Sequence, residues 1–78
     1  MSYDLVVQRA DDGSVSLVGE APGRIHVSVE LLNSADPSLV KINDRGDVMF
    51  SLTNAVLWYR RVGLVDGDAR CIEFERVA

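Results

Sequence analysis

The chain has 78 residues, of which 47% are hydrophobic and 26% are charged, and its formal net charge at pH 7 is -4. This length allows one small domain over residues 1–78, and the hydrophobic fraction excludes intrinsic disorder. The negative charge disfavours nonspecific binding to nucleic acid, because such binding gains affinity when basic side chains displace counterions from phosphates.

Cys71 is the only cysteine, so an intramolecular disulfide is impossible. Small secreted domains usually carry several cysteines, and a lone thiol therefore indicates a reducing, cytoplasmic setting. Residues 1–4 include no basic side chain, and no apolar run approaches the roughly 18 residues of a membrane span. We therefore expect neither a secretory signal nor a membrane anchor.

Twelve valines favour strands throughout the chain, because side chains branched at Cβ lose less freedom on a pleated strand than in a helix.

The first predicted hairpin turns at residues 11–13. If Val7 and Leu17 lie on the same face, the residue numbers of each facing pair must add up to an even number. An even sum leaves an odd number of residues in the turn, which selects the three-residue loop 11–13. Gly13 then takes the left-handed backbone conformation that this loop needs.

The next predicted strand spans residues 24–31, where apolar and polar residues alternate. Residues 21–23 would form a second three-residue loop, with Gly23 in the left-handed position. This loop would pair the strand with the preceding segment, so that Leu17 lies opposite Val27.

A polar break follows and contains Ser34, which favours a single helical or 3₁₀ turn over residues 34–39. The next predicted hairpin turns at residues 44–46. This is the third loop that ends in Gly, and it pairs Ile42 with Val48.

Two further hairpins are expected in the C-terminal half. A turn at Thr53-Asn54 would place Met49 opposite Trp58. The second hairpin turns at Asp66-Gly67, a two-residue signal. Its predicted cross-strand pairs are Tyr59 with Phe74, Arg60 with Glu73, and Val62 with Cys71.

A helix over residues 55–65, with Asn54 as its N-cap, is the alternative for the segment between these turns. Val56, Val62 and Gly63 are poor helix formers, so we prefer a strand. The sequence as a whole predicts an all-β domain. We expect six or seven mostly antiparallel strands in a meander, forming a small barrel or a compact sandwich, with at most one short helical turn.

Candidate catalytic groups are scarce. His26 is the only histidine, and strand alternation directs it toward solvent. Cys71 has no flanking motif of a nucleophile. We therefore expect no enzymatic activity, no catalytic residue and no cofactor.

Four acidic turn residues are the best candidates for a metal site. In a meander, Asp44 and Asp47 would lie at the same end as Asp66 and Asp68, where carboxylates could bind Ca²⁺. However, the spacing of an EF-hand is missing, and Asp is common in turns for its own sake. We therefore assign no metal site.

Both faces of the C-terminal sheet are predicted to be apolar. One face would carry Met49, Trp58 and Val62, and the other Phe50 and Tyr59. Either the sheet curls into a barrel whose second face is covered by the N-terminal hairpin, or one of the two faces is an association surface.

The expected function is that of a non-enzymatic protein-binding module or a homo-oligomeric subunit. We expect its partner, a protein or a second copy, to contact an apolar sheet face at Trp58, Met49, Val62 and Arg60. The edge strands, residues 3–9 and 70–77, are the other candidates. The alternatives are an acidic decoy that inhibits a nucleic-acid-binding protein, and a β domain that binds a small ligand or Ca²⁺.

Overall fold

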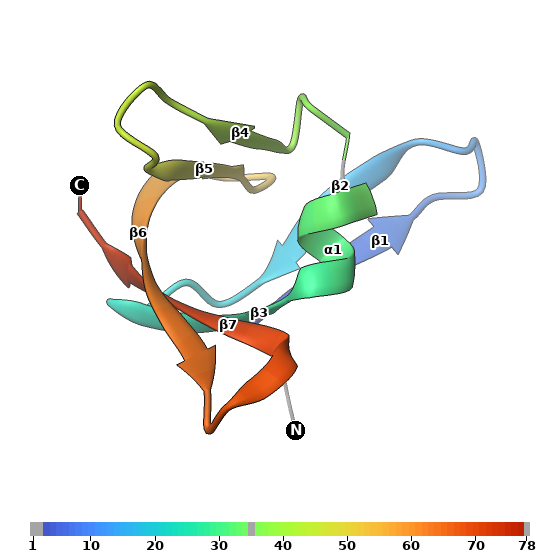
Figure 1. The fold of residues 1–78 in the computed structure, drawn as a ribbon. Coiled ribbons are helices and arrows are strands. Elements are labelled where there is room, and N and C mark those ends of the chain that lie inside the picture. Colours follow the sequence, from blue (N-terminus) through green and yellow to red (C-terminus); the bar gives the residue numbers. More distant parts are fainter. Residues whose placement is uncertain (1–2, 35, 78) are drawn as a thin grey trace.

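The computed structural model describes residues 3–34 and 36–77, and these residues form seven strands and one short helix (Figure 1). The prediction of a small all-β domain is confirmed. In chain order the elements are β1 (Leu5–Arg9), β2 (Val15–Gly19), β3 (Arg24–Ser28), α1 (Val29–Ser34), β4 (Val40–Ile42), β5 (Val48–Ser51), β6 (Val56–Val65) and β7 (Asp68–Arg76).

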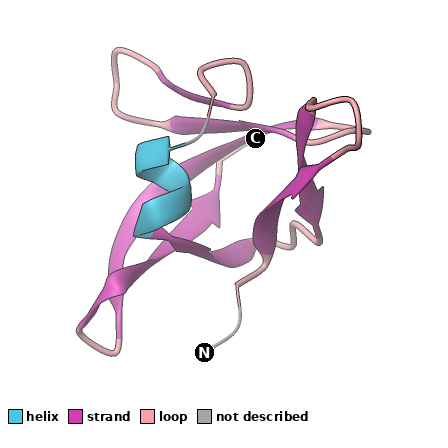
Figure 2. Ribbon diagram, turned by 90° about the vertical axis from the view of Figure 1, so that its right-hand side faces the viewer, coloured by secondary structure: helices cyan, strands magenta, loops and turns pink. Residues whose placement is uncertain are grey.

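The strands form two antiparallel sheets. β1 and β2 make a two-stranded sheet, and the other strands make a five-stranded sheet in the order β3-β7-β6-β5-β4. β4 to β7 are thus the predicted meander, whereas β3 lies beside β7 at the far edge. Helix α1 connects the two edge strands of the larger sheet, and the strands of the described ranges do not close a barrel (Figure 2).

Three hairpins have the predicted register. Val7 lies opposite Leu17, Ile42 opposite Val48, and Met49 opposite Trp58. Gly13 and Gly46 have positive φ angles of 87° and 84°, as the three-residue loops require. Residues 56–65 form a strand, so the strand was the correct choice over the alternative helix.

The predicted pairing of residues 15–19 with residues 24–31 is wrong. β3 pairs with β7 instead, and Gly23 has no positive φ angle. Asp4 occupies the edge of β3 that faces away from β7. Its N–H donates to the carbonyl of His26 at 2.9 Å, and its carboxylate accepts the N–H of His26 at 2.7 Å. The last strand is consequently an inner strand and not an edge.

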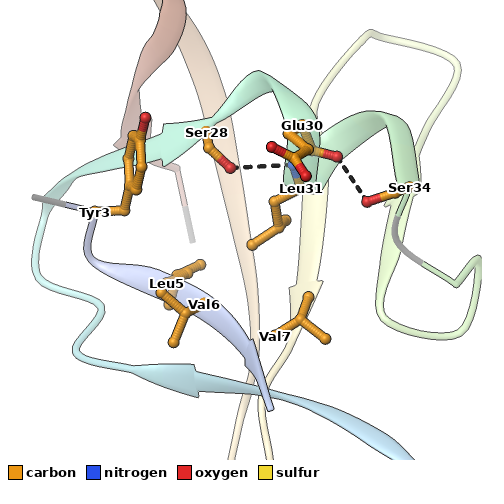
Figure 3. A pocket seen from close by; sticks show the side chains of 8 residues that line it. All are labelled: Tyr3, Leu5, Val6, Val7, Ser28, Glu30, Leu31 and Ser34. Atoms are coloured by element: carbon orange, nitrogen blue, oxygen red, sulfur yellow. Dashed lines mark hydrogen bonds between the residues drawn. The ribbon is translucent and has the colours of Figure 1, made fainter. Parts of the chain in front are cut away.

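The predicted strand over residues 24–31 ends early, at Ser28, because the serine caps a helix (Figure 3). Its hydroxyl oxygen accepts the N–H of Leu31 at 3.0 Å, which satisfies one of the unpaired donors of the first helical turn. Helix α1 therefore precedes the turn predicted over residues 34–39. Ser34 ends the helix, and its hydroxyl donates to the carbonyl of Glu30 at 2.7 Å.

The hairpin of β6 and β7 has the predicted turn but a different register. Asp66 and Gly67 have φ angles of 49° and 73°, as a two-residue turn with both central residues left-handed requires. Two irregularities then shift the pairing, one at Val62 and one after Asp68. The three predicted cross-strand pairs are therefore wrong: Tyr59 lies opposite Arg76, Arg60 lies opposite Glu75, and Val62 falls at the first irregularity and does not pair with Cys71.

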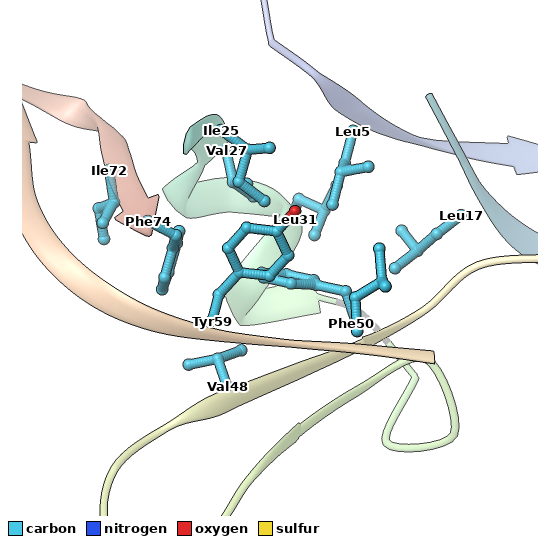
Figure 4. Close-up of a cluster of buried hydrophobic side chains, with 11 residues drawn as sticks. Leu5, Leu17, Ile25, Val27, Leu31, Val48, Phe50, Tyr59, Ile72 and Phe74 are labelled. Carbon is cyan, nitrogen blue, oxygen red and sulfur yellow. The ribbon is translucent and has the colours of Figure 1, made fainter. Parts of the chain in front are cut away.

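The core lies between the two sheets and is closed at one side by α1 (Figure 4). Phe50 is at its centre, with edge-to-face ring contacts to Tyr59 at 5.8 Å and to Phe74 at 5.5 Å. The hydroxyl of Tyr59 donates to the carbonyl of Pro22 at 2.7 Å. The residues that fill the core are Leu5, Leu17, Ile25, Val27, Leu31, Val48, Phe50, Leu57, Tyr59, Ile72 and Phe74.

Candidate functional site: the outer face of the five-stranded sheet

The N-terminal hairpin covers only one face of the five-stranded sheet. Leu5 and Leu17 from this hairpin, and Leu31 from α1, are buried against the face that carries Phe50 and Tyr59. The face that carries Trp58 is therefore the one that the hairpin leaves uncovered. We call that second face the outer face and define it by Lys41, Met49, Val56, Trp58 and Arg60.

The outer face follows directly from the strand register. Lys41, Met49 and Trp58 lie opposite one another across β4, β5 and β6. Val56 and Arg60 flank Trp58 on the same side of β6, because alternate residues of a strand share a face. Met49 and Trp58 are half-buried, whereas Val56 is 59% exposed.

One end of the outer face is hollowed, with a volume of about 360 Å³. Its wall comes from three segments: the turn between β4 and β5, the middle of β6, and the chain end after β7. Figure 1 shows this turn and the C-terminal end on the same side of the molecule. The hollow is lined by Asn43, Arg45, Asp47, Trp58, Arg60 and Val77.

Hydrogen bonds hold all three segments in place. The side-chain oxygen of Asn43 accepts the N–H groups of Arg45 and Asp47, each at 2.9 Å. The N–H of Val77 donates to the carbonyl of Trp58 at 3.0 Å. The walls of the hollow are thus fixed by the fold before any partner binds.

Two cationic side chains in the hollow have no ion pair. The expected partner of Arg60, Glu73, binds Arg24 instead at 2.9 Å, and Glu75 lies 3.9 Å from the same guanidinium. Within residues 3–34 and 36–77, neither Arg45 nor Arg60 has a carboxylate within ion-pair distance. Both guanidiniums are therefore available to a ligand.

Three of the four predicted partner-binding residues come together. Met49, Trp58 and Arg60 share the outer face, and the last two line the hollow. Val62 lies at the irregularity of β6, is 49% exposed and does not line the hollow. Arg45 was missed as a site residue. The predicted pairing of Met49 with Trp58, continued by two residues along both strands, already places the end of its turn opposite Arg60.

The two candidate catalytic residues are poorly placed for chemistry. His26 is half-buried in β3, opposite Glu73, and Cys71 is fully buried opposite Ser28. Burial raises the pKa of the Cys71 thiol, and the negative charges of Asp68 and Asp4 raise it further. A thiol of raised pKa stays protonated at neutral pH and is a weak nucleophile.

The four acidic turn residues do not assemble. β6 has 10 residues, and it extends well beyond its pairing with β5, so the turns at 44–46 and 66–67 lie at opposite ends of Figure 1. Asp68 accepts the N–H of Arg70 at 2.9 Å. In the described part of the chain, no group of three or more His, Cys, Asp or Glu side chains could hold a metal ion.

Other hollows lie elsewhere, and two of them are larger: one of about 720 Å³ beside the turn between β1 and β2, and one of about 620 Å³ beside α1 and the start of β7. Two are smaller. An apolar cleft of about 220 Å³ lies between α1, β4 and β7, with Arg61 among its lining residues. This volume is below the roughly 300 Å³ at which pockets for small ligands begin. A groove of about 190 Å³ runs between β1 and α1 and is lined in part by Tyr3, Val6 and Val7 (Figure 3).

Comparisons with protein-family models, with curated proteins and with solved structures gave no match. In the residues that the structure describes, no helix has the length and apolar character needed to cross a membrane.

Proposed function

We propose that this chain is a non-enzymatic protein-binding module whose partner contacts the outer face of the five-stranded sheet. The observation that carries the proposal is that the N-terminal hairpin and α1 both pack on the inner face. Met49 and Trp58 are consequently left without a covering layer in a domain of 78 residues.

The composition of the outer face supports this proposal. Aromatic residues, Met and Arg are enriched in protein interfaces, and Trp and Arg are prominent among the residues that dominate binding energy. Trp58 lies between Val56 and Arg60 on β6, with Met49 directly across the ladder. An uncovered sheet face with one large aromatic residue and flanking charges suits a protein better than a small molecule.

The edge of β1 is a second candidate surface, and it suits self-association by strand pairing. β1 pairs only with β2, and the N–H of Ala10 bonds to the carbonyl of Ser14. Since hydrogen-bonded and non-bonded pairs alternate, Leu5, Val7 and Arg9 direct their backbone groups away from β2. Val6 is 47% exposed on this strand.

Salt separates these surfaces from the acidic-decoy alternative. A decoy for a nucleic-acid-binding protein acts through long-range charge, so its affinity falls steeply as salt rises. Contacts through Met49, Trp58 or the edge of β1 depend mainly on burial of apolar surface and change little.

Sedimentation velocity over a range of concentrations tests the proposal. The wild type is compared with Trp58→Glu on the outer face and with Val6→Glu, which introduces the same charge at an exposed position on β1. We expect Trp58→Glu to abolish association with a copy or with a partner retained by the wild type, and to leave the circular dichroism spectrum unchanged. Val6→Glu should retain association.

Two outcomes contradict the proposal. If Trp58→Glu folds normally and associates as the wild type does, the outer face is not the binding surface. If Val6→Glu alone dissociates the complex, the edge of β1 is the interface. A wild type that stays monomeric at every concentration excludes a homo-oligomer and leaves a separate protein partner.

A further inference from the structure

Two arginines line the hollow at the end of the outer face, in a chain whose net charge is -4. Arg45 comes from the turn between β4 and β5 and Arg60 from the middle of β6, and Asp47 is the one acidic residue among the lining residues. Glu75 lies opposite Arg60 in the ladder of β6 and β7, but its carboxylate lies 3.9 Å from Arg24, so within residues 3–34 and 36–77 both arginines of the hollow keep guanidiniums without an ion pair beside the Trp58 ring.

We propose that this hollow binds an acidic segment of a protein partner, with a side-chain carboxylate between Arg45 and Arg60 and a neighbouring apolar side chain against Trp58. This inference rests on the proposed function, since it names the chemistry of the partner that the outer face receives. Arginine presents its donors in a planar fork that matches a carboxylate, and the Trp58 ring supplies apolar contact area.

The fold prepares the hollow for such a ligand. Asn43 holds the backbone at Arg45 and Asp47, and Gly46 completes the turn in the left-handed conformation. The volume of about 360 Å³ is at the lower end of the range for binding pockets, enough for neighbouring side chains of a short segment. Less ordering is therefore needed when a peptide binds.

A peptide fits the charges better than a nucleic acid does. A polyphosphate chain must approach the whole molecule, whose acidic residues outnumber basic ones by 12 to 8. A single carboxylate needs only the two guanidiniums of Arg45 and Arg60, which have no ion pair in the described part of the chain. Single-stranded nucleic acid would also use an arginine and a tryptophan, so it is included as an arm of the test.

Trp58 is the only tryptophan, so its fluorescence reports directly on the hollow. The probes are a blocked peptide in which Glu alternates with Leu, the same peptide with Gln in place of Glu, and a single-stranded oligothymidylate. We expect the Glu peptide to shift the emission of the full chain saturably. The Gln peptide and the oligothymidylate should have no effect at the same concentrations.

Charge variants locate the site. Arg45→Gln and Arg60→Gln should each weaken the binding of the Glu peptide about tenfold, since each removes charge-assisted hydrogen bonds. Arg9→Gln makes the same charge change on β1 and should leave the affinity unchanged. Asp47→Asn should strengthen binding a few-fold, because it removes the negative charge from the hollow.

Three results overturn the inference: no saturable shift with the Glu peptide, equal binding of the Gln peptide or the oligothymidylate, or equal weakening by Arg9→Gln. The proposed function fails separately, when Trp58→Glu folds and still associates in sedimentation. If Trp58→Glu abolishes association while the Glu peptide does not bind, the outer face is an interface for a partner of different chemistry.

Discussion

At the scale of single residues, Tyr59 ties the core to the connection between the two sheets. Its ring packs against Phe50, and its hydroxyl donates to the carbonyl of Pro22 in the segment between β2 and β3. Arg76 donates its N–H to the carbonyl of the next residue, Gly23, at 2.8 Å. The segment therefore has both a side-chain and a backbone bond to the larger sheet.

We expect Tyr59→Phe to lower the free energy of unfolding by about 1 kcal/mol, because it leaves the carbonyl of Pro22 without this donor. Urea unfolding followed by fluorescence measures the change. Tyr3→Phe, which removes a hydroxyl from an exposed ring, is the control and should change the stability by less than about 0.5 kcal/mol.

Because the hydroxyl of Tyr59 is buried, we also expect the domain to lose stability at alkaline pH. Burial raises the pKa of Tyr59 above its ordinary value of about 10. The folded chain therefore keeps this proton to a higher pH than the unfolded chain does. Stability is unaffected below pH about 10 and falls as the pH rises beyond it.

The free energy of unfolding, measured from pH 8 to about pH 11, checks this expectation. The wild type should lose more stability above pH 10 than Tyr59→Phe does. The raised pKa of Cys71 has the same sign, but it is common to both proteins and cancels in the comparison. Parallel curves would show that Tyr59 ionises as freely in the folded chain as in the unfolded one.

Gly19 is the position where a side chain fits least. Its φ angle is 142°, and a Cβ there would collide with the carbonyl oxygen of Asp4. Gly19→Ala should therefore cost about 2 kcal/mol or more, whereas Gly23→Ala, with open space around it, should cost less than about 0.5 kcal/mol. Thermal unfolding of both variants gives the comparison, and equal melting temperatures would contradict the close approach of β1 and β2 here.

At the scale of elements, local turn signals predicted the hairpins well. Gly13 and Gly46 set loops whose length determines the parity of the facing strands, so Val7, Ile42 and Met49 were matched to the correct partners. Strands that follow each other in the chain form such hairpins at a small cost in loop-closure entropy.

Non-local pairing could not be predicted in the same way. β3 pairs with β7 across more than 40 residues, and no turn chemistry specifies that contact. The irregularities at Val62 and after Asp68 were also hidden, because a single extra residue changes the parity of every later pair. For the site, the pairing of Met49 with Trp58 could be predicted. The ion pair of Glu73 with Arg24, which replaces the expected pair of Glu73 with Arg60, could not, because it requires β3 to lie beside β7.

The helix shows how one local bond outweighs a pattern. The alternation through Val29 and Leu31 favours a strand, but the same two residues also fit one helical turn once Ser28 accepts the N–H of Leu31. Leu31 then enters the core from α1.

We therefore expect Ser28→Ala to destabilise the domain by about 1 kcal/mol through the loss of the helix cap. Ser34→Ala is the matched control at the other end of α1. Its hydroxyl only donates to a carbonyl within the helix, so the change should be within about 0.5 kcal/mol. Chemical denaturation measures both, and a larger effect at Ser34 would be inconsistent with the capping role of Ser28.

In the molecule as a whole, the five-stranded sheet has two apolar faces, and the other elements cover only one of them. The hairpin and α1 cover the inner face, where Phe50 and Tyr59 are fully buried. The outer face keeps Met49 and Trp58 half-buried, with the unpaired Arg45 and Arg60 at one end. This asymmetry is the physical basis of the proposed binding function.

Collisional quenching of Trp58 fluorescence by acrylamide shows whether the outer face is the binding surface, because the chain has one tryptophan and it lies on that face. We expect clear quenching in the dilute wild-type chain, since Trp58 is half-buried, and a marked fall in the quenching constant when the chain associates. An equal quenching constant in the free and the associated chain would place the interface elsewhere and rule out the outer face.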